Sequence, residues 1–165
     1  MKKALIIIDL QKGFINKLTS KLPNKIKEYF QSHSSDFDLI LFTQYKNHQD
    51  SPLAKTLDYH EFSTPEEYDI VDELKEFITS HNLFTKDTYS SFVDEKLHNT
   101  LKENNIEEVY LMGIMTENCV LTFARDAVDR GFFVTVLKDY CGTITNLEKH
   151  NAALKIISDN IGKVK

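Results

Sequence analysis

Five short apolar runs, separated by stretches of helical periodicity, constrain the fold of this chain more than any other feature. The runs are rich in β-branched and aromatic residues, and several are apolar at every position, as expected for parallel strands covered by helices on both faces. They are Ala4–Ile8, Leu39–Thr43, Leu83–Lys86, Val109–Ile114 and Phe132–Lys138. Strands that alternate with helices predict βαβ units, and therefore an α/β three-layer sandwich around a mostly parallel sheet.

Capping signals mark several helix ends between and after these runs. Thr64–Glu67 combines a threonine N-cap, a proline in the first turn and a capping-box glutamate, and it predicts a helix that continues toward Ile78. Thr145 and Glu148 form a second possible capping box. Gly131 predicts the end of a helix that begins near Cys119.

The length, charge and cysteine content of the chain limit the functional classes to which it can belong. At 165 residues, the chain is expected to form one domain, residues 1–165. A net charge of -5 without a basic stripe argues against a nucleic-acid partner. No apolar run approaches the roughly 20 residues needed to cross a bilayer, and the run that ends before Asp9 is too short for a signal peptide. With Cys119 and Cys141 as its only cysteines, the chain has no disulfide framework, so we expect reduced thiols and a cytoplasmic location.

One segment does not follow the alternation of strands and helices. Gln44–Ser63 follows the second strand and spans roughly 20 residues with little periodicity. A loop of this length inside a compact domain is usually functional, such as a lid or a binding loop. The alternative is a surface excursion that contains a short helix around Leu53–Leu57.

Three chemically active residues follow predicted strands. Asp9 follows the first strand, Lys86 ends the third, and Cys119 lies just after the fourth. The carboxyl ends of parallel strands meet at one sheet edge, where such folds build their sites. Taken singly, each residue has a structural interpretation, namely a capping carboxylate, a surface lysine and a small buried thiol. An acid, a base and a thiol at one edge instead indicate a nucleophilic enzyme.

The position of Cys119 also suggests how it is activated. The pattern places it in the first turn of a helix, with Asn118 or Thr116 as the possible cap. Free N–H groups and the helix dipole favour an anion there. We therefore expect a lowered pKa for this thiol and a thiolate near neutral pH.

Three motifs in order carry a family resemblance over nearly the whole chain. Asp9–Phe14 resembles a D-x-Q-x-x-F opening, and Lys86–Phe92 resembles a lysine motif that ends in a small residue and phenylalanine. Gly113–Val120 resembles a G-x-x-T-x-x-C-V nucleophile motif. In these features the chain resembles the isochorismatase-like cysteine hydrolases, a family that includes nicotinamidases, N-carbamoylsarcosine amidases and ureidoacrylate amidases.

The resemblance implies a catalytic triad of Asp9, Lys86 and Cys119 on a six-stranded, mostly parallel sheet. Asp9 would take the thiol proton, Lys86 would orient and support the pair, and the sulfur would form a thioester with a small amide or carbamoyl substrate while its C–N bond is cleaved. The oxyanion hole maps to the backbone N–H groups of Met115 and Cys119, with a cis peptide bond at Ile114–Met115. The resemblance further implies a homodimer or homotetramer.

The chain departs from the nicotinamidase pattern after the second strand. Nicotinamidases carry a metal-binding D-x-H motif there, but Tyr45 and Asn47 occupy these two positions. Out of register nearby lie His48, Asp50, Asp58 and His60. We therefore expect neither a metal nor another cofactor. Phe14 and Tyr45 are expected to line the substrate pocket, with Gln44 and Tyr89 behind them.

Several alternatives remain open at this point. One alternative is an isochorismatase-type ether hydrolase, which need not use the cysteine. Another is a non-catalytic binding or thiol redox-sensing relative on the same fold, with Cys141 as a resolving partner for Cys119. The spacing of Cys119 and Arg125 matches a phosphatase loop, but no glycine lies between them. His150 would allow a Cys–His pair, although its charged neighbours favour a solvated helix face.

Overall fold

The sheet of this protein is entirely parallel in the computed structural model, which describes residues 1–165. Its strand order is β3-β2-β1-β4-β5-β6. The strands are β1 (Lys2–Ile8), β2 (Leu39–Tyr45), β3 (Leu83–Lys86), β4 (Ile106–Ile114), β5 (Phe133–Gly142) and β6 (Lys163–Val164). All five predicted runs are strands, with ends that differ by only a few residues, and the two-residue β6 completes the sheet.

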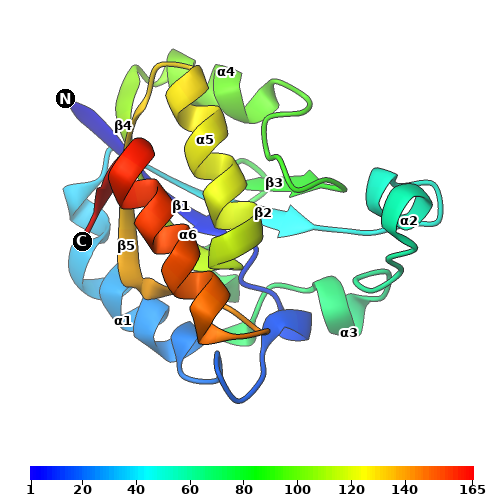
Figure 1. Ribbon diagram of the computed structural model, residues 1–165. Helices are drawn as coiled ribbons and strands as arrows, with labels where there is room; N and C mark the ends of the chain where they lie inside the picture. The colour runs from blue at the N-terminus through cyan, green and yellow to red at the C-terminus, as the bar shows by residue number, and fades with distance from the viewer.

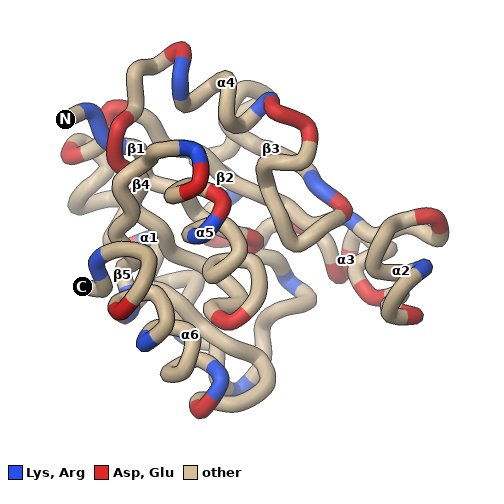
Figure 2. Tube along the Cα trace, turned by 45° about the horizontal axis from the view of Figure 1, so that its top comes forward, with Lys and Arg blue, Asp and Glu red and all other residues tan.

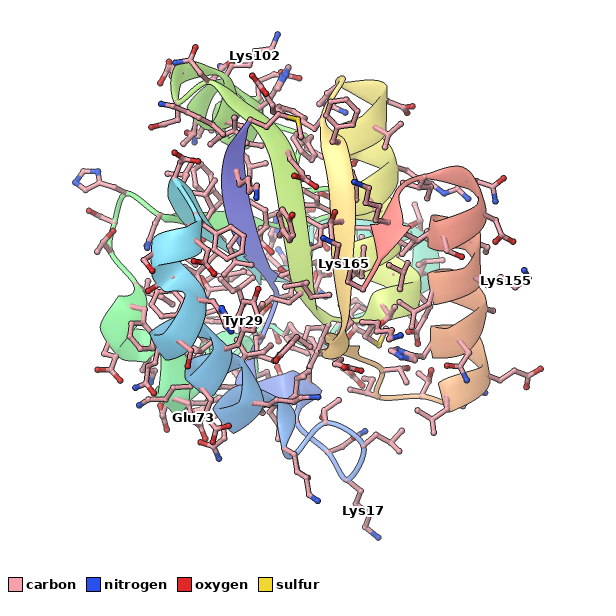
Figure 3. All side chains as sticks on the ribbon, turned by 90° about the vertical axis from the view of Figure 1, so that its left-hand side faces the viewer. Lys17, Tyr29, Glu73, Lys102, Lys155 and Lys165 are labelled. Carbon is pink, nitrogen blue, oxygen red and sulfur yellow. The ribbon has the colours of Figure 1, made fainter.

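Helices cover the sheet on both faces, which confirms the predicted α/β three-layer sandwich. They are α1 (Leu22–His33), α2 (Pro52–Leu57), α3 (Pro65–Tyr68), α4 (Lys96–Glu103), α5 (Leu121–Asp129) and α6 (Leu147–Asn160). The last three pack on one face and α1 packs on the other (Figures 1 and 3). The short helices α2 and α3 lie beyond the carboxyl ends of the central strands (Figure 1).

Burial on both faces explains the unbroken apolar runs. Successive side chains of a strand point to opposite faces, yet Leu5 and Ile6 of β1 are both fully buried. Ile6 belongs to the core beneath α4–α6, together with Phe123. Leu5 belongs to the core beneath α1, together with Ile26. The sheet therefore separates two hydrophobic cores, each closed by its own helices.

A glycine allows the two central strands to meet where the site begins. Gly113 of β4 pairs with Ile8 of β1 and has a φ of 125°. A Cβ atom at this position would lie 2.0 Å from the Ile8 carbonyl oxygen. Only glycine fits both the backbone conformation and the contact, so this residue sets the spacing of the strand ends next to Asp9.

Two predicted helix starts have different outcomes. The capping box of Thr64 and Glu67 is present, but the helix ends at Tyr68 and a separate 3-10 helix follows over Asp72–Phe77. The capping box predicted at Thr145 is wrong. Asn146 is the N-cap of α6, since its side chain accepts a hydrogen bond from the Lys149 N–H.

Charged residues are scattered along the chain rather than gathered on one side (Figure 2). This distribution matches the absence of a basic stripe in the sequence. None of the helices is long and apolar enough to cross a membrane.

Candidate active site

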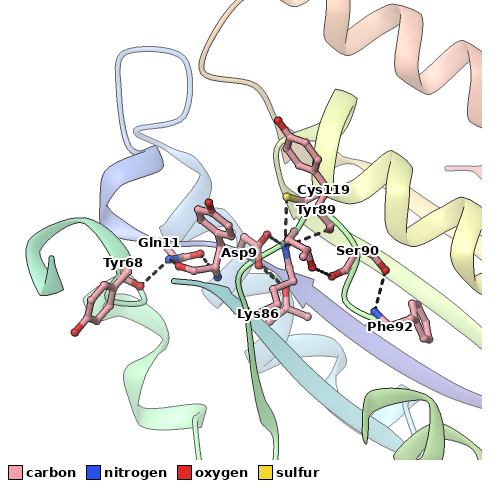
Figure 4. A network of polar contacts seen from close by, with 11 residues as sticks. Asp9, Gln11, Tyr68, Lys86, Tyr89, Ser90, Phe92 and Cys119 are labelled. Carbon is pink, nitrogen blue, oxygen red and sulfur yellow. Dashed lines mark hydrogen bonds and ion pairs between the residues drawn. The ribbon is translucent and has the colours of Figure 1, made fainter. Parts of the chain in front are cut away.

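Asp9, Lys86 and Cys119 converge at the carboxyl edge of the sheet (Figure 4). The Lys86 Nζ lies 2.8 Å from the Asp9 Oδ2 and 3.5 Å from the Cys119 Sγ. The Asp9 side chain is fully buried and that of Lys86 is 7% exposed. The lysine thus links the carboxylate and the thiol in a site largely closed to water.

The backbone turns sharply at Asp9 and aims its carboxylate into the site. Asp9 has a φ of 48° directly after β1, and its Oδ1 accepts a 2.6 Å hydrogen bond from the Thr43 hydroxyl of β2. Its Oδ2 pairs with the Lys86 ammonium, and the Cys119 thiol lies close enough to Asp9 to interact with it. Oδ1 therefore holds the carboxylate in position, and Oδ2 keeps a lone pair that can accept a proton.

Lys86 is fixed by more than its ion pair. Its Nζ also donates to the carbonyl oxygens of Thr88, at 3.0 Å, and Tyr89, at 3.3 Å. Burial acts to lower the pKa of Lys86, but the Asp9 carboxylate and Cys119 together hold it above its usual range. The side chain is therefore an ammonium ion at neutral pH.

The loop after Lys86 is tied to the helix that follows the cysteine. The Ser90 hydroxyl donates a 2.5 Å hydrogen bond to Asp126 of α5. It also accepts one from the Phe92 N–H (Figure 4). Phe92 packs in the core against Phe123, also of α5. The packing of Phe92 explains the phenylalanine that ends the lysine motif.

Cys119 is a thiol rather than a thiolate at rest, which contradicts the expectation from its helical position. Burial is the largest effect and raises the pKa of Cys119 to about 12. The nearby Lys86 ammonium lowers this pKa, but the Asp9 carboxylate raises it and opposes the effect of the lysine. The residue also lies in a π-helical turn, Thr116–Val120, ahead of α5 and not in the first turn of a regular helix. Attack by the sulfur therefore requires a base that removes its proton.

The π-helical turn is anchored through its first residue. The Thr116 hydroxyl donates to the Gly142 carbonyl oxygen at 3.0 Å, and the His150 Nδ1 lies 2.8 Å from the same hydroxyl. With that hydroxyl proton used, the hydrogen-bond network assigns the His150 Nδ1 as a donor. His150 is thus half-buried, with one ring nitrogen bonded within the protein, rather than fully solvated as its charged neighbours suggested. Burial lowers its pKa, which favours the neutral ring.

The sulfur opens onto a small apolar cavity of about 200 Å³. The wall contains Phe14 and Tyr45, as expected, and also Tyr89, which was expected to lie behind them. Gln44 does not line it, because neighbouring residues of β2 face opposite ways and the Gln44 amide donates to the Tyr68 carbonyl oxygen instead. The remaining lining residues are Leu53, Tyr59, Glu61, Met115, Asn118, Cys119, Ile144 and Thr145.

The two residues expected to form the oxyanion hole both border this cavity. Met115 and Cys119 are among its lining residues, and the peptide bond that joins Ile114 to Met115 is cis. A second and larger depression, of about 730 Å³, runs along β3 and α4. It is mostly polar and does not reach Cys119, so the candidate site is the smaller cavity.

Asn47 lies outside the cavity lining, and its amide group holds two residues of the cavity wall in place. Its Nδ2 donates to the carbonyl oxygens of Tyr59, at 2.7 Å, and Glu61, at 2.9 Å. Its Oδ1 accepts from the His48 N–H and from the Ser51 hydroxyl. The segment 47–61, which contains α2, is therefore a closed loop whose two ends are joined by one side chain.

The donor set of this loop does not fit a metal ion. The Asn47 amide is saturated by the contacts just described, and His48 and His60 are paired with Asp87 and Asp58, respectively. No three histidine, cysteine, aspartate or glutamate side chains cluster in a way that would hold a metal.

Gln11 of the opening motif holds the backbone next to the site. Its amide nitrogen donates to the carbonyl oxygens of Tyr45 and Tyr68, both at 2.7 Å, and its carbonyl oxygen accepts from the Tyr45 N–H at 2.8 Å (Figure 4). The motif thus supplies the carboxylate of Asp9 and, two residues later, the amide of Gln11, which fixes the end of β2 through hydrogen bonds to the Tyr45 backbone.

Comparison with known proteins places this chain in a family. The isochorismatase domain model matches residues 3–164. An uncharacterised isochorismatase family protein of Bacillus subtilis, PncA, is 30% identical over 98% of this chain and 97% of its own length. The nicotinamidase of Saccharomyces cerevisiae is 28% identical over 87% of this chain and 89% of its own.

Solved structures agree with this placement. The crystal structure of the nicotinamidase PncA from Bacillus subtilis superposes with a TM-score of 0.86, at 26% identity, over 99% of both chains. That of the N-carbamoylsarcosine amidase from Thermoplasma acidophilum has a TM-score of 0.82 at 21% identity, over 100% of this chain and 96% of the other, which supports the fold. Because the domain model covers almost the entire chain and the fold agrees, the protein belongs to the isochorismatase family of hydrolases.

Proposed function

We propose that this protein hydrolyses the C–N bond of a small amide or carbamoyl compound through a thioester on Cys119. The observation that carries the proposal is the position of the Lys86 Nζ, 2.8 Å from Asp9 and 3.5 Å from a sulfur that opens onto an apolar cavity. A buried acid–base pair beside a thiol provides a nucleophile together with its base.

The first half of the proposed reaction is acylation. Asp9 Oδ2 accepts the Cys119 proton while the sulfur attacks the substrate carbonyl carbon, and Lys86 stabilises the anionic pair. The carbonyl oxygen, now negative, is bound by the N–H groups of Met115 and Cys119. When the C–N bond breaks, Asp9 returns the proton to the leaving nitrogen, which departs as ammonia or an amine, and a thioester remains.

The second half regenerates the thiol. Asp9 accepts a proton from a water molecule that attacks the thioester carbonyl carbon. When the C–S bond breaks, the carboxylic acid is released and the proton returns to the sulfur. Thr43 holds the other oxygen of Asp9 throughout, so the base does not rotate between the two halves.

The cavity restricts the size and charge of the substrate. Its volume of about 200 Å³ suits a small molecule, and most of its lining is aromatic or aliphatic. Glu61 is the only charged residue in the lining, and the nearby Lys86 ammonium is already paired with Asp9. A substrate carboxylate would have no cation to bind, so the cavity favours uncharged amides.

The test is amide turnover combined with intact-mass spectrometry on the wild type, Cys119→Ala and Cys141→Ala. The panel comprises nicotinamide, simple amides, ureides and carbamoyl amino acids. We expect release of ammonia or amine, and an acyl adduct on the wild type when the reaction is stopped early. Cys119→Ala should lose at least about 1,000-fold in turnover and form no adduct.

The matched control is Cys141→Ala, since Cys141 is equally buried but does not line the cavity. It should retain turnover and adduct. Turnover that survives in Cys119→Ala would contradict the thioester route. A complete absence of turnover and adduct in the wild type over the whole panel would favour a binding protein on the same fold.

A further inference from the structure

The Tyr45 hydroxyl is a buried polar group without a partner at the edge of the proposed active site. Tyr45 is 4% exposed and lines the cavity, and its hydroxyl oxygen makes no hydrogen bond within the protein. Buried tyrosine hydroxyls normally find a partner, because an unpaired one costs about 1–3 kcal/mol. An orphaned hydroxyl in the wall of a cavity is therefore a candidate contact for a bound molecule.

The tyrosine is held in place rather than free to move toward solvent. Gln11 fixes both its N–H and its carbonyl group. Its ring packs edge-on against Phe62, with centroids 5.9 Å apart, and the Lys86 Nζ lies 5.6 Å from its centroid. The hydroxyl therefore stays near the catalytic lysine, unsatisfied, until a ligand arrives.

The hydroxyl can act as a donor over the whole neutral range. Burial raises the pKa of Tyr45 to about 12, although the Lys86 ammonium acts to lower it. The proton is therefore retained. The neighbouring Tyr59 hydroxyl already donates to Glu61, at 3.2 Å, whereas the proton of the Tyr45 hydroxyl has no acceptor within the protein.

We propose that the Tyr45 hydroxyl donates a hydrogen bond to an acceptor atom on the body of the substrate and so determines specificity. The inference rests on the proposed amidase function and sharpens it: the substrate is a small, uncharged amide with a second lone-pair acceptor, such as a ring nitrogen or a carbonyl oxygen, apart from the scissile group. Tyr45 takes no part in proton transfer; it orients the amide over Cys119.

The test compares two amides that differ in one acceptor atom. Nicotinamide and benzamide have the same shape, but only nicotinamide carries a ring nitrogen. We expect wild-type kcat/KM to favour nicotinamide by about 10-fold or more, since a site built to hydrogen-bond a substrate discriminates against the analogue that lacks the partner. Tyr45→Phe should bring this ratio close to 1 by raising KM for nicotinamide, with the pH profile of kcat unchanged and benzamide turnover nearly unaffected.

Tyr29→Phe is the matched control, because it removes a tyrosine hydroxyl from α1, where the ring packs on Tyr140 away from the cavity. It should keep the wild-type ratio. An equal preference for the two amides in the wild type, or an unchanged ratio in Tyr45→Phe, would overturn the inference.

A binding measurement separates this inference from the proposed reaction. In the Cys119→Ala background, calorimetry with nicotinamide and benzamide should show the same preference, and the added Tyr45→Phe change should remove it. Selective binding that depends on Tyr45, without turnover in the wild type, would refute the amidase proposal and keep Tyr45 as the recognition group. Failure of Cys119→Ala to distinguish the two amides would refute the role of Tyr45.

Discussion

At the scale of single residues, burial has a larger effect on the pKa of Cys119 than the helical position predicted from the sequence. The sequence predicts that Asp9, Lys86 and Cys119 meet at one sheet edge, because each stands where a parallel strand ends, and the structure brings them together there. The protonation state could not be predicted in this way, since it depends on how far the sulfur is removed from water and on the carboxylate beside it. The result is a nucleophile that stays protonated until a base acts on it.

This arrangement predicts opposite effects of one substitution on two properties of the site. Asp9→Asn removes the carboxylate that raises the pKa of Cys119, and it leaves Lys86, which lowers that pKa. The thiolate fraction at a given pH should increase. Amide turnover should nevertheless fall by at least about 100-fold, because the general base is gone.

The measurement is the rate of iodoacetamide alkylation of Cys119 between pH 7 and pH 10, followed by mass spectrometry and compared with turnover at the same pH. Thermal unfolding of the variant establishes that it remains folded. Asp58→Asn, which changes an exposed acid of the 47–61 loop, should alter neither property. Slower alkylation in Asp9→Asn would contradict the assigned charge balance.

At the scale of elements, short-range patterns predicted the strands well and the cavity wall poorly. Strands buried on both faces must be apolar throughout, so their sequences are conspicuous. Helix α1 was not predicted, because it buries only Leu22, Pro23 and Ile26 and the rest of its surface is polar or half-exposed. The wall formed by the 47–61 loop depends on bonds from one side chain to two distant carbonyl groups, which leave no periodic pattern.

The contact between the two central strands predicts a large effect at Gly113. Gly113→Ala should lower the free energy of unfolding by about 3 kcal/mol or more, because the new Cβ atom meets the Ile8 carbonyl oxygen at a φ that L-residues avoid. Gly131→Ala is the matched control, since Gly131 also has a positive φ, of 86°, but its Cβ would meet nothing within 4 Å. It should cost only about 1 kcal/mol.

Urea denaturation gives the loss of unfolding free energy in each variant. Because both glycines have a positive φ, the difference between the two losses reports the steric clash at Gly113 alone. Equal losses of stability in the two variants would show that β1 and β4 can move apart at no cost. In that case Gly113 would not set the geometry beside Asp9.

At the scale of the whole molecule, both thiols are buried in the core beneath α4–α6. Burial raises the pKa of Cys141, like that of Cys119, to about 12, from 9.0 in an exposed chain. Between these two pH values the unfolded chain loses thiol protons that the folded protein retains. Ionisation therefore favours the unfolded state as the pH rises, and stability that is complete below pH 9 is lost above it.

We expect the free energy of unfolding to fall by about 1.4 kcal/mol per pH unit for each thiol between pH 9 and pH 12. Cys141→Ala should be somewhat less stable than the wild type at pH 7, owing to the small cavity, but should lose stability less steeply above pH 9. Denaturant titrations at a series of pH values give both slopes. Parallel curves for the two proteins would show that Cys141 ionises equally in both states.

The hydrogen bonds by which Asn47 closes the 47–61 loop affect how the substrate range of such a protein can evolve. The proposed catalytic side chains come from the sheet edge and from the turn before α5, whereas part of the cavity wall comes from one loop closed on itself. Substitutions within that loop alter which molecule is admitted and leave the proton-transfer geometry untouched. Substrate range can therefore drift under selection, or be exchanged by grafting residues 47–61 as a unit, without rebuilding the chemistry beneath it.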